Sequence, residues 1–278
     1  MTRLLGVTVL AALLAGLVAC SQVTDRGSQG VSEGTGLGTA RREETTAQER
    51  TTATEKSPTA EREGTVVTDA PASLDYVALG DSLAAGIGAR RGYVERYASY
   101  LRTDTGARVN VVNLGQSGQT SSQLLQALRS DPSTRQALGS AEVITFNIGI
   151  NDLGHAGQAY ENKTCGGDDN QECLRMAVES LEENWDAVLA EILSLRSTDN
   201  TIIRTAGIGY TPRVDEVFEP YLDEVNRHVA ATAANNDIPY AQPYLGKEHL
   251  SPDGLHPNDN GYEVIADRLR ELGYGPLG

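Results

Sequence analysis

Short apolar runs alternate with segments of helical period from residue 73 onward, and this alternation restricts the chain to few folds. Runs with the length and composition of buried strands cover residues 74–79, 109–113, 143–147, 202–205 and 238–241. Apolar residues recur at helical spacing over 93–102, 121–129, 174–192, 214–229 and 260–272. Because strand and helix follow each other in turn, we expect a mainly parallel sheet with helices on both faces. Ligands of such sheets bind beyond the carboxyl ends of the strands.

Residues 1–19 have the composition of an export signal. Arg3 supplies a positive charge, residues 4–19 are apolar, and a small residue precedes Cys20. The apolar stretch is too short for a convincing membrane span. Its junction resembles the cleavage box of bacterial lipoproteins, in which the cysteine becomes the lipidated first residue of the mature chain. The alternative is an ordinary secretory signal with an incidental cysteine.

The segment after Cys20 is expected to be a disordered tether. Residues 21–72 contain no Phe, Tyr or Trp and are rich in Thr, Glu, Arg, Gly and Ser. Such a segment buries too little apolar surface to offset the entropy of folding. Its ends would lie about 40 Å apart as a flexible coil. We therefore predict a lipidated Cys20 and tether over 20–72, and a folded domain over 73–278 held outside the cytoplasm on the bacterial cell membrane.

The charge of the chain narrows the range of partners. Its formal net charge is -15, and most of the acidic excess falls after residue 73. Nucleic acids and anionic membrane surfaces are therefore poor partners for the folded domain, so we expect membrane contact only through the lipid anchor. The acidity can also serve solubility alone. We expect a monomer.

Two cysteines remain if Cys20 carries lipid. Cys165 and Cys173 lie in a polar stretch with the glycine and asparagine signals of a surface loop. In an exported protein this pair predicts a disulfide that staples the loop. The spacing lacks the close pairs of a zinc site, and no histidine adjoins either cysteine, so we expect no metal there.

Polar motifs follow the predicted strands. The first strand runs into GDSL at residues 80–83, where Ser82 is either a helix cap or a nucleophile. The second is followed by NLGQSG at 113–118, whose glycines let a backbone N–H approach a reacting oxygen. GIND at 149–152 follows the third strand and offers the Asn151 carboxamide. DGLH at 253–256 places Asp253 and His256 three residues apart, just before the last helix.

Each motif is weak alone, but the four in this order resemble the SGNH hydrolase family, also called the GDSL esterases and lipases, over nearly all of residues 74–272. The resemblance implies a three-layer α/β/α sandwich with a mainly parallel, flavodoxin-like, five-stranded sheet. It implies a serine esterase or lipase that needs no cofactor or metal. No motif of the family is missing.

Each functional residue of the family has a counterpart here. The resemblance makes Ser82 the nucleophile, with Asp253 and His256 as acid and base. It places the oxyanion donors at the Ser82 N–H, Gly118 and Asn151. We prefer Gly118 to Gly115 because the family's glycine usually precedes one residue and then Thr or Ser, as Gly118 does.

The chemistry is consistent without the family name. A serine hydroxyl is a poor nucleophile until a base takes its proton, so His256 must reach Ser82. Asp253 would fix the His256 tautomer and stabilise the imidazolium. One oxyanion donor lowers the barrier by about 3 to 4 kcal/mol.

Other functions remain open from the sequence. The same site could transfer the acyl group to a sugar or lipid hydroxyl, or remove acetyl groups from a carbohydrate. A noncatalytic surface binding lipoprotein would not need the intact set of catalytic residues. The substrate is expected to be a small-molecule or lipid ester.

Secondary roles are expected for nearby residues. We interpret Asp81 as a helix or turn cap and Asp152 as support for the loop around Asn151, while His155 could line the pocket. Gly207, Gly209, Val214 and Phe218 are expected to shape an acyl pocket of modest length.

Overall fold

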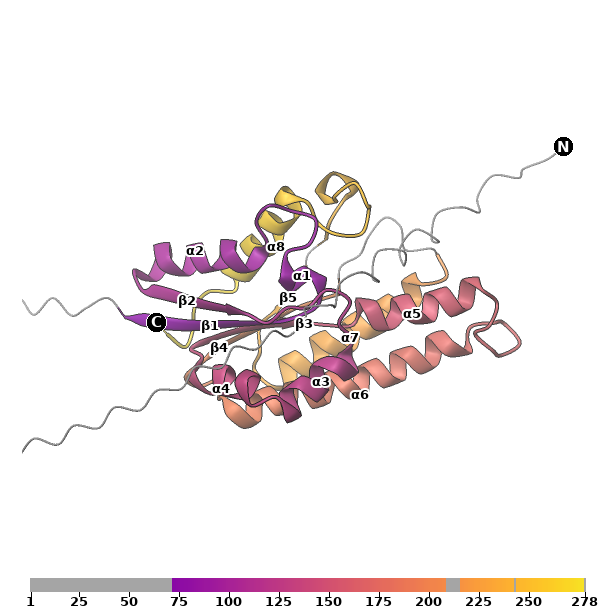
Figure 1. Cartoon of the computed structure of the whole chain (residues 1–278), viewed down its shortest axis with the longest axis horizontal. Helices are drawn as coiled ribbons and strands as arrows, with labels where there is room; N and C mark the ends of the chain where they lie inside the picture. The colour runs from indigo at the N-terminus through magenta and orange to yellow at the C-terminus, as the bar shows by residue number, and fades with distance from the viewer. Residues whose placement is uncertain (1–71, 209–215, 243, 278) are drawn as a thin grey trace, which may run out of the picture. The chain divides into compact units, whose positions relative to one another are not determined.

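The computed structural model describes residues 72–208, 216–242 and 244–277, and the elements are arranged around one parallel sheet (Figure 1). The sheet contains β1 (Ser73–Gly80), β2 (Arg108–Asn113), β3 (Val143–Asn147), β4 (Ile202–Ala206) and β5 (Tyr240–Ala241) in the order β2-β1-β3-β4-β5. All its pairs are parallel. The predicted fold class is therefore confirmed. The predicted export signal, Cys20 and the tether up to residue 71 lie outside the described residues.

Helices cover both faces of the sheet, as Figure 1 shows. On one face lie α2 (Tyr93–Thr105) and α8 (Asp259–Glu271). On the other face lie α3 (Ser121–Ser130), α4 (Pro132–Ser140), α6 (Glu172–Leu195) and α7 (Glu219–Asn235). The short α1 (Ser82–Ala85) directly follows β1, and α5 (Ile150–Glu161) directly follows β3.

The central strand β1 is buried on both faces because side chains alternate along it. Val77 and Leu79 pack toward α3 and α6, whereas Tyr76 and Ala78 pack toward α2 and α8. This explains why β1 reads in the sequence as a continuous apolar run instead of an alternating one.

Helices α4 and α5 were not predicted. In α4, Asp131 caps the helix by accepting hydrogen bonds from the N–H groups of Ser133 (3.1 Å) and Thr134 (3.2 Å), and Pro132 opens the first turn. In α5, Gly154 and Gly157 lower the helical propensity, so the segment reads as a loop. Of the predicted helix over 214–229, residues 214 and 215 lie outside the described residues, residues 216–218 form a turn, and α7 begins only at Glu219.

No helix within the described ranges is long and apolar enough to cross a membrane. The strand ends instead gather several polar motifs at one edge of the sheet. β1 ends at Gly80, β2 at Asn113 and β3 at Asn147, and each is followed by one of the motifs found in the sequence.

Candidate active site

The predicted nucleophile Ser82 is the first residue of α1 and is only 7% exposed. The cap of this helix is not Ser82 but Asp81, whose Oδ1 accepts a hydrogen bond from the Leu83 N–H at 2.9 Å. Asp81 thus has the capping role that the sequence predicted for it. The Ser82 side chain is not needed for capping, which leaves its hydroxyl available for chemistry.

A glycine before the nucleophile allows β1 to approach β3 closely. Gly80 has φ of 134°, and a Cβ at this position would lie 2.2 Å from the backbone oxygen of Asn147. No other residue fits there without moving the backbone. The β1–α1 turn that carries Ser82 is therefore fixed against the end of β3.

Asp253 and His256 form a hydrogen-bonded pair on one tight turn. His256 Nδ1 lies 2.7 Å from Asp253 Oδ2. The other carboxylate oxygen, Oδ1, accepts hydrogen bonds from the Leu255 N–H (2.8 Å), the His256 N–H (2.9 Å) and the Ser251 hydroxyl (2.8 Å). Partial burial opposes ionisation, but these hydrogen bonds hold the pKa of Asp253 well below its usual range. An ionised Asp253 makes His256 Nδ1 a donor and leaves Nε2 free to act as a base.

The turn that carries His256 packs against the loop that follows Ser82. Gly88 in this loop has φ of 96°, and a Cβ there would lie 2.7 Å from the His256 Cβ. The Tyr262 hydroxyl of α8 donates to the Ile87 backbone oxygen at 2.7 Å and lies 3.4 Å from the Ser82 backbone oxygen. The structure thus brings together the segments of Ser82 and His256, which are far apart in sequence.

Gly118 and Asn151 also lie side by side. The Asn151 Nδ2 donates one hydrogen bond to the backbone oxygen of Gln119 at 2.9 Å, which fixes the carboxamide next to Gly118. Gly118 has φ of 80°, and apart from its chain neighbours no described heavy atom lies within 4 Å of the position of its missing Cβ. The Cβ side of Gly118 is therefore open among the described residues.

The neighbouring Gly115 has a different role. A Cβ on Gly115 would lie 2.6 Å from the Ala84 Cβ, so this glycine is required for packing against α1. Asn113 stabilises the same turn: its Oδ1 accepts from the Gly115 N–H at 3.0 Å, and its Nδ2 donates to the Ala84 backbone oxygen at 2.7 Å. Gly115 and Asn113 therefore serve packing and turn structure, and the choice of Gly118 as the oxyanion glycine stays a prediction.

Two further carboxylates lie near the site, Asp81, which is buried, and Asp152, which is half-buried. Burial raises the pKa of Asp81 to about 6, against the opposing effects of the Leu83 N–H and of His256. Burial also raises the pKa of Asp152, against hydrogen bonds from the Ser121 hydroxyl (2.7 Å) and the Ser121 N–H (3.0 Å). Asp152 therefore ties the start of α5, and with it Asn151, to α3.

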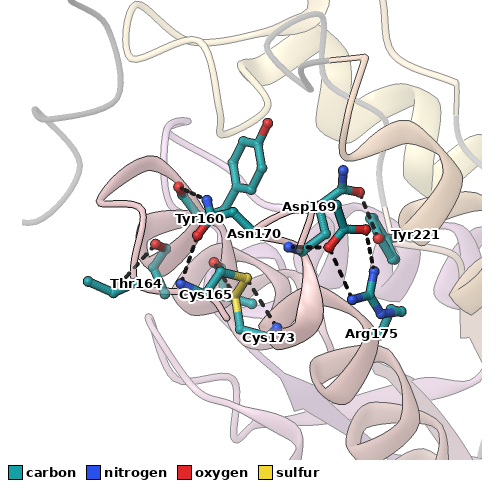
Figure 2. The surroundings of a disulfide bond; sticks show 11 residues. Tyr160, Thr164, Cys165, Asp169, Asn170, Cys173, Arg175 and Tyr221 are labelled. Atoms are coloured by element: carbon teal, nitrogen blue, oxygen red, sulfur yellow. Dashed lines mark hydrogen bonds and ion pairs between the residues drawn. A yellow bond between two sulfur atoms is a disulfide. The ribbon is translucent and has the colours of Figure 1, made fainter. Parts of the chain in front are cut away.

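A disulfide joins Cys165, in the loop between α5 and α6, to Cys173 in the first turn of α6 (Figure 2). Asn170 braces this loop: its Oδ1 accepts from the Cys165 N–H at 3.1 Å, and its Nδ2 donates to the Tyr160 backbone oxygen at 2.8 Å. The loop therefore stabilises the end of α5 that is remote from Asn151.

The residues expected to shape an acyl pocket are only partly described. Gly209 and Val214 lie outside the described residues. Phe218 packs edge-on against Tyr160 of α5, with 5.7 Å between the ring centroids. His155 is exposed on α5, and its place in a pocket stays a prediction. Within the described ranges, no cluster of three His, Cys, Asp or Glu side chains could hold a metal ion.

Comparisons with known proteins agree with this geometry. The model of the GDSL-like Lipase/Acylhydrolase family matches residues 78–264. The spore germination lipase LipC of Bacillus licheniformis is 29% identical over 216 residues, which cover 74% of this chain and 99% of that protein.

Solved structures show the same fold. The lipase Lip_vut3 from a goat rumen metagenome has a TM-score of 0.66 and 29% identity, covering 74% of this chain and 100% of that one. The acetylxylan esterase Axe2 of Geobacillus stearothermophilus has a TM-score of 0.56 at 19% identity, covering 73% of this chain and 95% of that one, and shares the fold alone.

Proposed function

Because the chain belongs to the GDSL-like lipase/acylhydrolase family, we propose that it is a serine esterase that cleaves carboxylic ester bonds through an acyl-enzyme on Ser82. The observation that carries this proposal is the 2.7 Å hydrogen bond between Asp253 and His256, on a turn packed against the loop that follows Ser82. This arrangement supports a base with a defined tautomer acting on a hydroxyl that is not used for capping.

In the first half-reaction the Ser82 oxygen attacks the ester carbonyl while His256 Nε2 takes the hydroxyl proton. The carbonyl oxygen becomes negative and accepts hydrogen bonds from the backbone N–H groups of Ser82 and Gly118 and from Asn151 Nδ2. The C–O bond to the alcohol then breaks, and His256 returns the proton to the leaving oxygen. Asp253 stays ionised throughout and stabilises the imidazolium.

In the second half-reaction water takes the place of the alcohol. His256 removes a proton from the water as its oxygen attacks the acyl-enzyme, and the same donors hold the second tetrahedral intermediate. Collapse of this intermediate breaks the bond to Ser82, which recovers its proton from His256. The products are one carboxylic acid and one alcohol.

The proposed substrates are lipid or lipid-like esters. This choice is supported by two relatives at 29% identity that are named as lipases, LipC and Lip_vut3. The likeness to an acetylxylan esterase extends to the fold alone and carries no substrate. Hydrolysis of nitrophenyl esters from about two to sixteen carbons, alongside a lysophospholipid and an acetylated sugar, tests the choice. A preference for the acetylated sugar would reject a lipid ester.

The mechanism is tested by removing its two central groups. Ser82→Ala should remain folded because Asp81 keeps the cap, but ester turnover and labelling by a fluorophosphonate should be lost, by several orders of magnitude for turnover. His256→Ala should cost about as much as Ser82→Ala, and the double variant little more, since the two groups act as a unit. Near wild-type hydrolysis by folded Ser82→Ala would refute the acyl-enzyme.

A further inference from the structure

A cavity of about 270 Å³ is bordered by the loop that joins β2 to α3. None of Ser82, Asn151, Asp253 and His256 lines it. Its walls come from the end of β1, the loop over 113–119, α3 and the start of α4. The cavity is therefore separate from the proposed active site and needs its own explanation.

One side of this cavity is apolar. Leu79 of β1 and Leu124 of α3 are 1% and 2% exposed, and Leu114 and Ala127 are half-buried beside them. An apolar cavity of about 150 Å³ is large enough to bind benzene, so this larger space can take a chain of about six to eight carbons.

The cavity also has a polar group in its lining, the side chain of Gln119. Its side chain is 5% exposed, and its Oε1 is buried without a hydrogen-bond partner among the described residues. The backbone of Gln119 is fully used, because its N–H donates to the Gln116 oxygen at 3.1 Å and its oxygen accepts from Asn151 at 2.9 Å. A buried acceptor without a partner is costly, and an O–H group in the cavity would satisfy it.

The charge of the lining limits the kind of ligand. Asp131 lies at the cavity, and hydrogen bonds from Thr134 and Ser133 hold the pKa of its carboxyl below the usual value. None of the described residues that line the cavity carries a positive charge. An anion would face a carboxylate with no compensating cation, whereas a neutral molecule would not.

We propose that this cavity binds a neutral, medium-chain alcohol, whose hydroxyl donates a hydrogen bond to Gln119 Oε1 and whose alkyl chain packs against the four apolar side chains. The proposal does not rest on the proposed esterase activity. A bound alcohol would contact Gln119, the residue that follows Gly118. The backbone oxygen of Gln119 accepts the hydrogen bond of Asn151.

Protein-observed NMR titration of the full chain with hexan-1-ol, and separately with hexanoate, tests the site. Hexan-1-ol should cause saturable shifts of the backbone amides of Gln119, Leu124 and Ala127, and hexanoate should bind at least about tenfold more weakly. Gln119→Leu should weaken hexan-1-ol binding about fivefold, the effect of one neutral hydrogen bond. Ala127→Leu should abolish it by filling the cavity.

The matched control is Gln126→Leu, the same substitution at an exposed position of α3, which should leave the affinity unchanged. The proposal is overturned if hexan-1-ol causes no saturable shift, because the cavity then holds only water. It is also overturned if the shifts centre on Ser82 and His256 instead, or if hexanoate binds as well as hexan-1-ol.

Discussion

The Asp81 carboxylate carries a free-energy cost at neutral pH because it is 1% exposed and receives a single hydrogen bond, from Leu83, among the described residues. Burial raises its pKa from 3.8 to about 6. As the pH rises, the unfolded chain loses this proton before the folded chain does. The contribution of Asp81 to stability therefore falls between about pH 4 and pH 6, by about 3 kcal/mol in total, and stays low above this range.

We predict that Asp81→Asn is more stable than the wild type at pH 8, by about 2 to 3 kcal/mol, and no more stable at pH 4. The asparagine oxygen can still accept the Leu83 N–H, so the cap is kept while the buried charge is removed. Urea unfolding of both proteins at the two pH values measures the difference. Asp199→Asn, at an exposed position, serves as the control and should change stability at neither pH. Equal stabilities of Asp81→Asn and wild type at pH 8 would contradict the prediction.

The Asn151 carboxamide has one hydrogen bond to Gln119 and one amide hydrogen left for a substrate oxygen. We predict that Asn151→Ala lowers kcat about a hundredfold to a thousandfold with little change in KM, because the lost interaction forms mainly in the transition state. Steady-state kinetics on a nitrophenyl ester measure both constants. Asn200→Ala, which precedes β4 at the opposite end of the strands, should leave both unchanged. A large rise in KM at constant kcat would instead assign Asn151 to ground-state binding.

Sequence reasoning named the candidate site residues because each lies in a short motif, either at a strand end or, for Asp253 and His256, just before α8. It could assign Asp81 as a cap from its place before a helix, and the hydrogen bond to Leu83 agrees. It could not find the role of Gly88, because this glycine is required by a contact with His256 that only the folded chain creates. For the same reason, the sequence could not predict that Gln119 Oε1 is buried without a hydrogen-bond partner among the described residues.

At the scale of the elements, the loop between α5 and α6 is closed by the disulfide and hydrogen-bonded to α7. The Tyr221 hydroxyl of α7 donates to the Gln171 Oε1 at 2.9 Å, and Arg175 forms an ion pair with Asp169 at 2.9 Å (Figure 2). These contacts hold the loop on the far side of α5 from Asn151, so it contributes to stability more than to chemistry.

We predict that the double variant Cys165→Ala, Cys173→Ala loses about 2 to 3 kcal/mol of stability, the entropy expected for closing a loop of about nine residues. Ester hydrolysis in the cold should be retained, because the loop carries neither Ser82 nor His256. Thermal unfolding and activity of the same samples measure the two effects. A reductant should lower the unfolding temperature of the wild type and leave that of the double variant unchanged. Two free thiols in wild-type protein purified under oxidising conditions would refute the pairing.

The predicted elements agree with the structure where the apolar period is long. Elements were missed or misjudged in length where glycine or a short polar turn interrupts this period. The long stripe over 174–192 marked α6 because its apolar face packs against the sheet. Helix α5 escaped prediction because Gly154 and Gly157 give it a weak local preference, and packing of Gly157 against Phe218 forms only in the fold. Strand β5 has two residues where the run suggested four, because the sheet pairs only Tyr240 and Ala241 with β4.

At the scale of the whole molecule, we propose that the domain is displayed outside the cytoplasm on a lipid anchor. The prediction is that mature protein begins at Cys20 and carries diacylglycerol there, because the apolar segment before it ends in a lipoprotein-like junction. Intact-mass analysis of protein extracted from membranes measures the modification. Cys20→Ser is the control and should be released in soluble form or retained unprocessed. Unmodified Cys20 in fully processed protein would reject the anchor.

The packing of α8 against the loop after Ser82 also has a consequence for biosynthesis. The Tyr262 hydroxyl reaches the Ser82 backbone across 180 positions of sequence, and the His256 turn immediately precedes α8. A nascent chain therefore holds its serine long before it holds its base, and the contact between their segments has to wait until nearly the whole domain has been synthesised. On the proposed mechanism, the chain has no base to activate Ser82 until the turn over 253–256 has joined the fold.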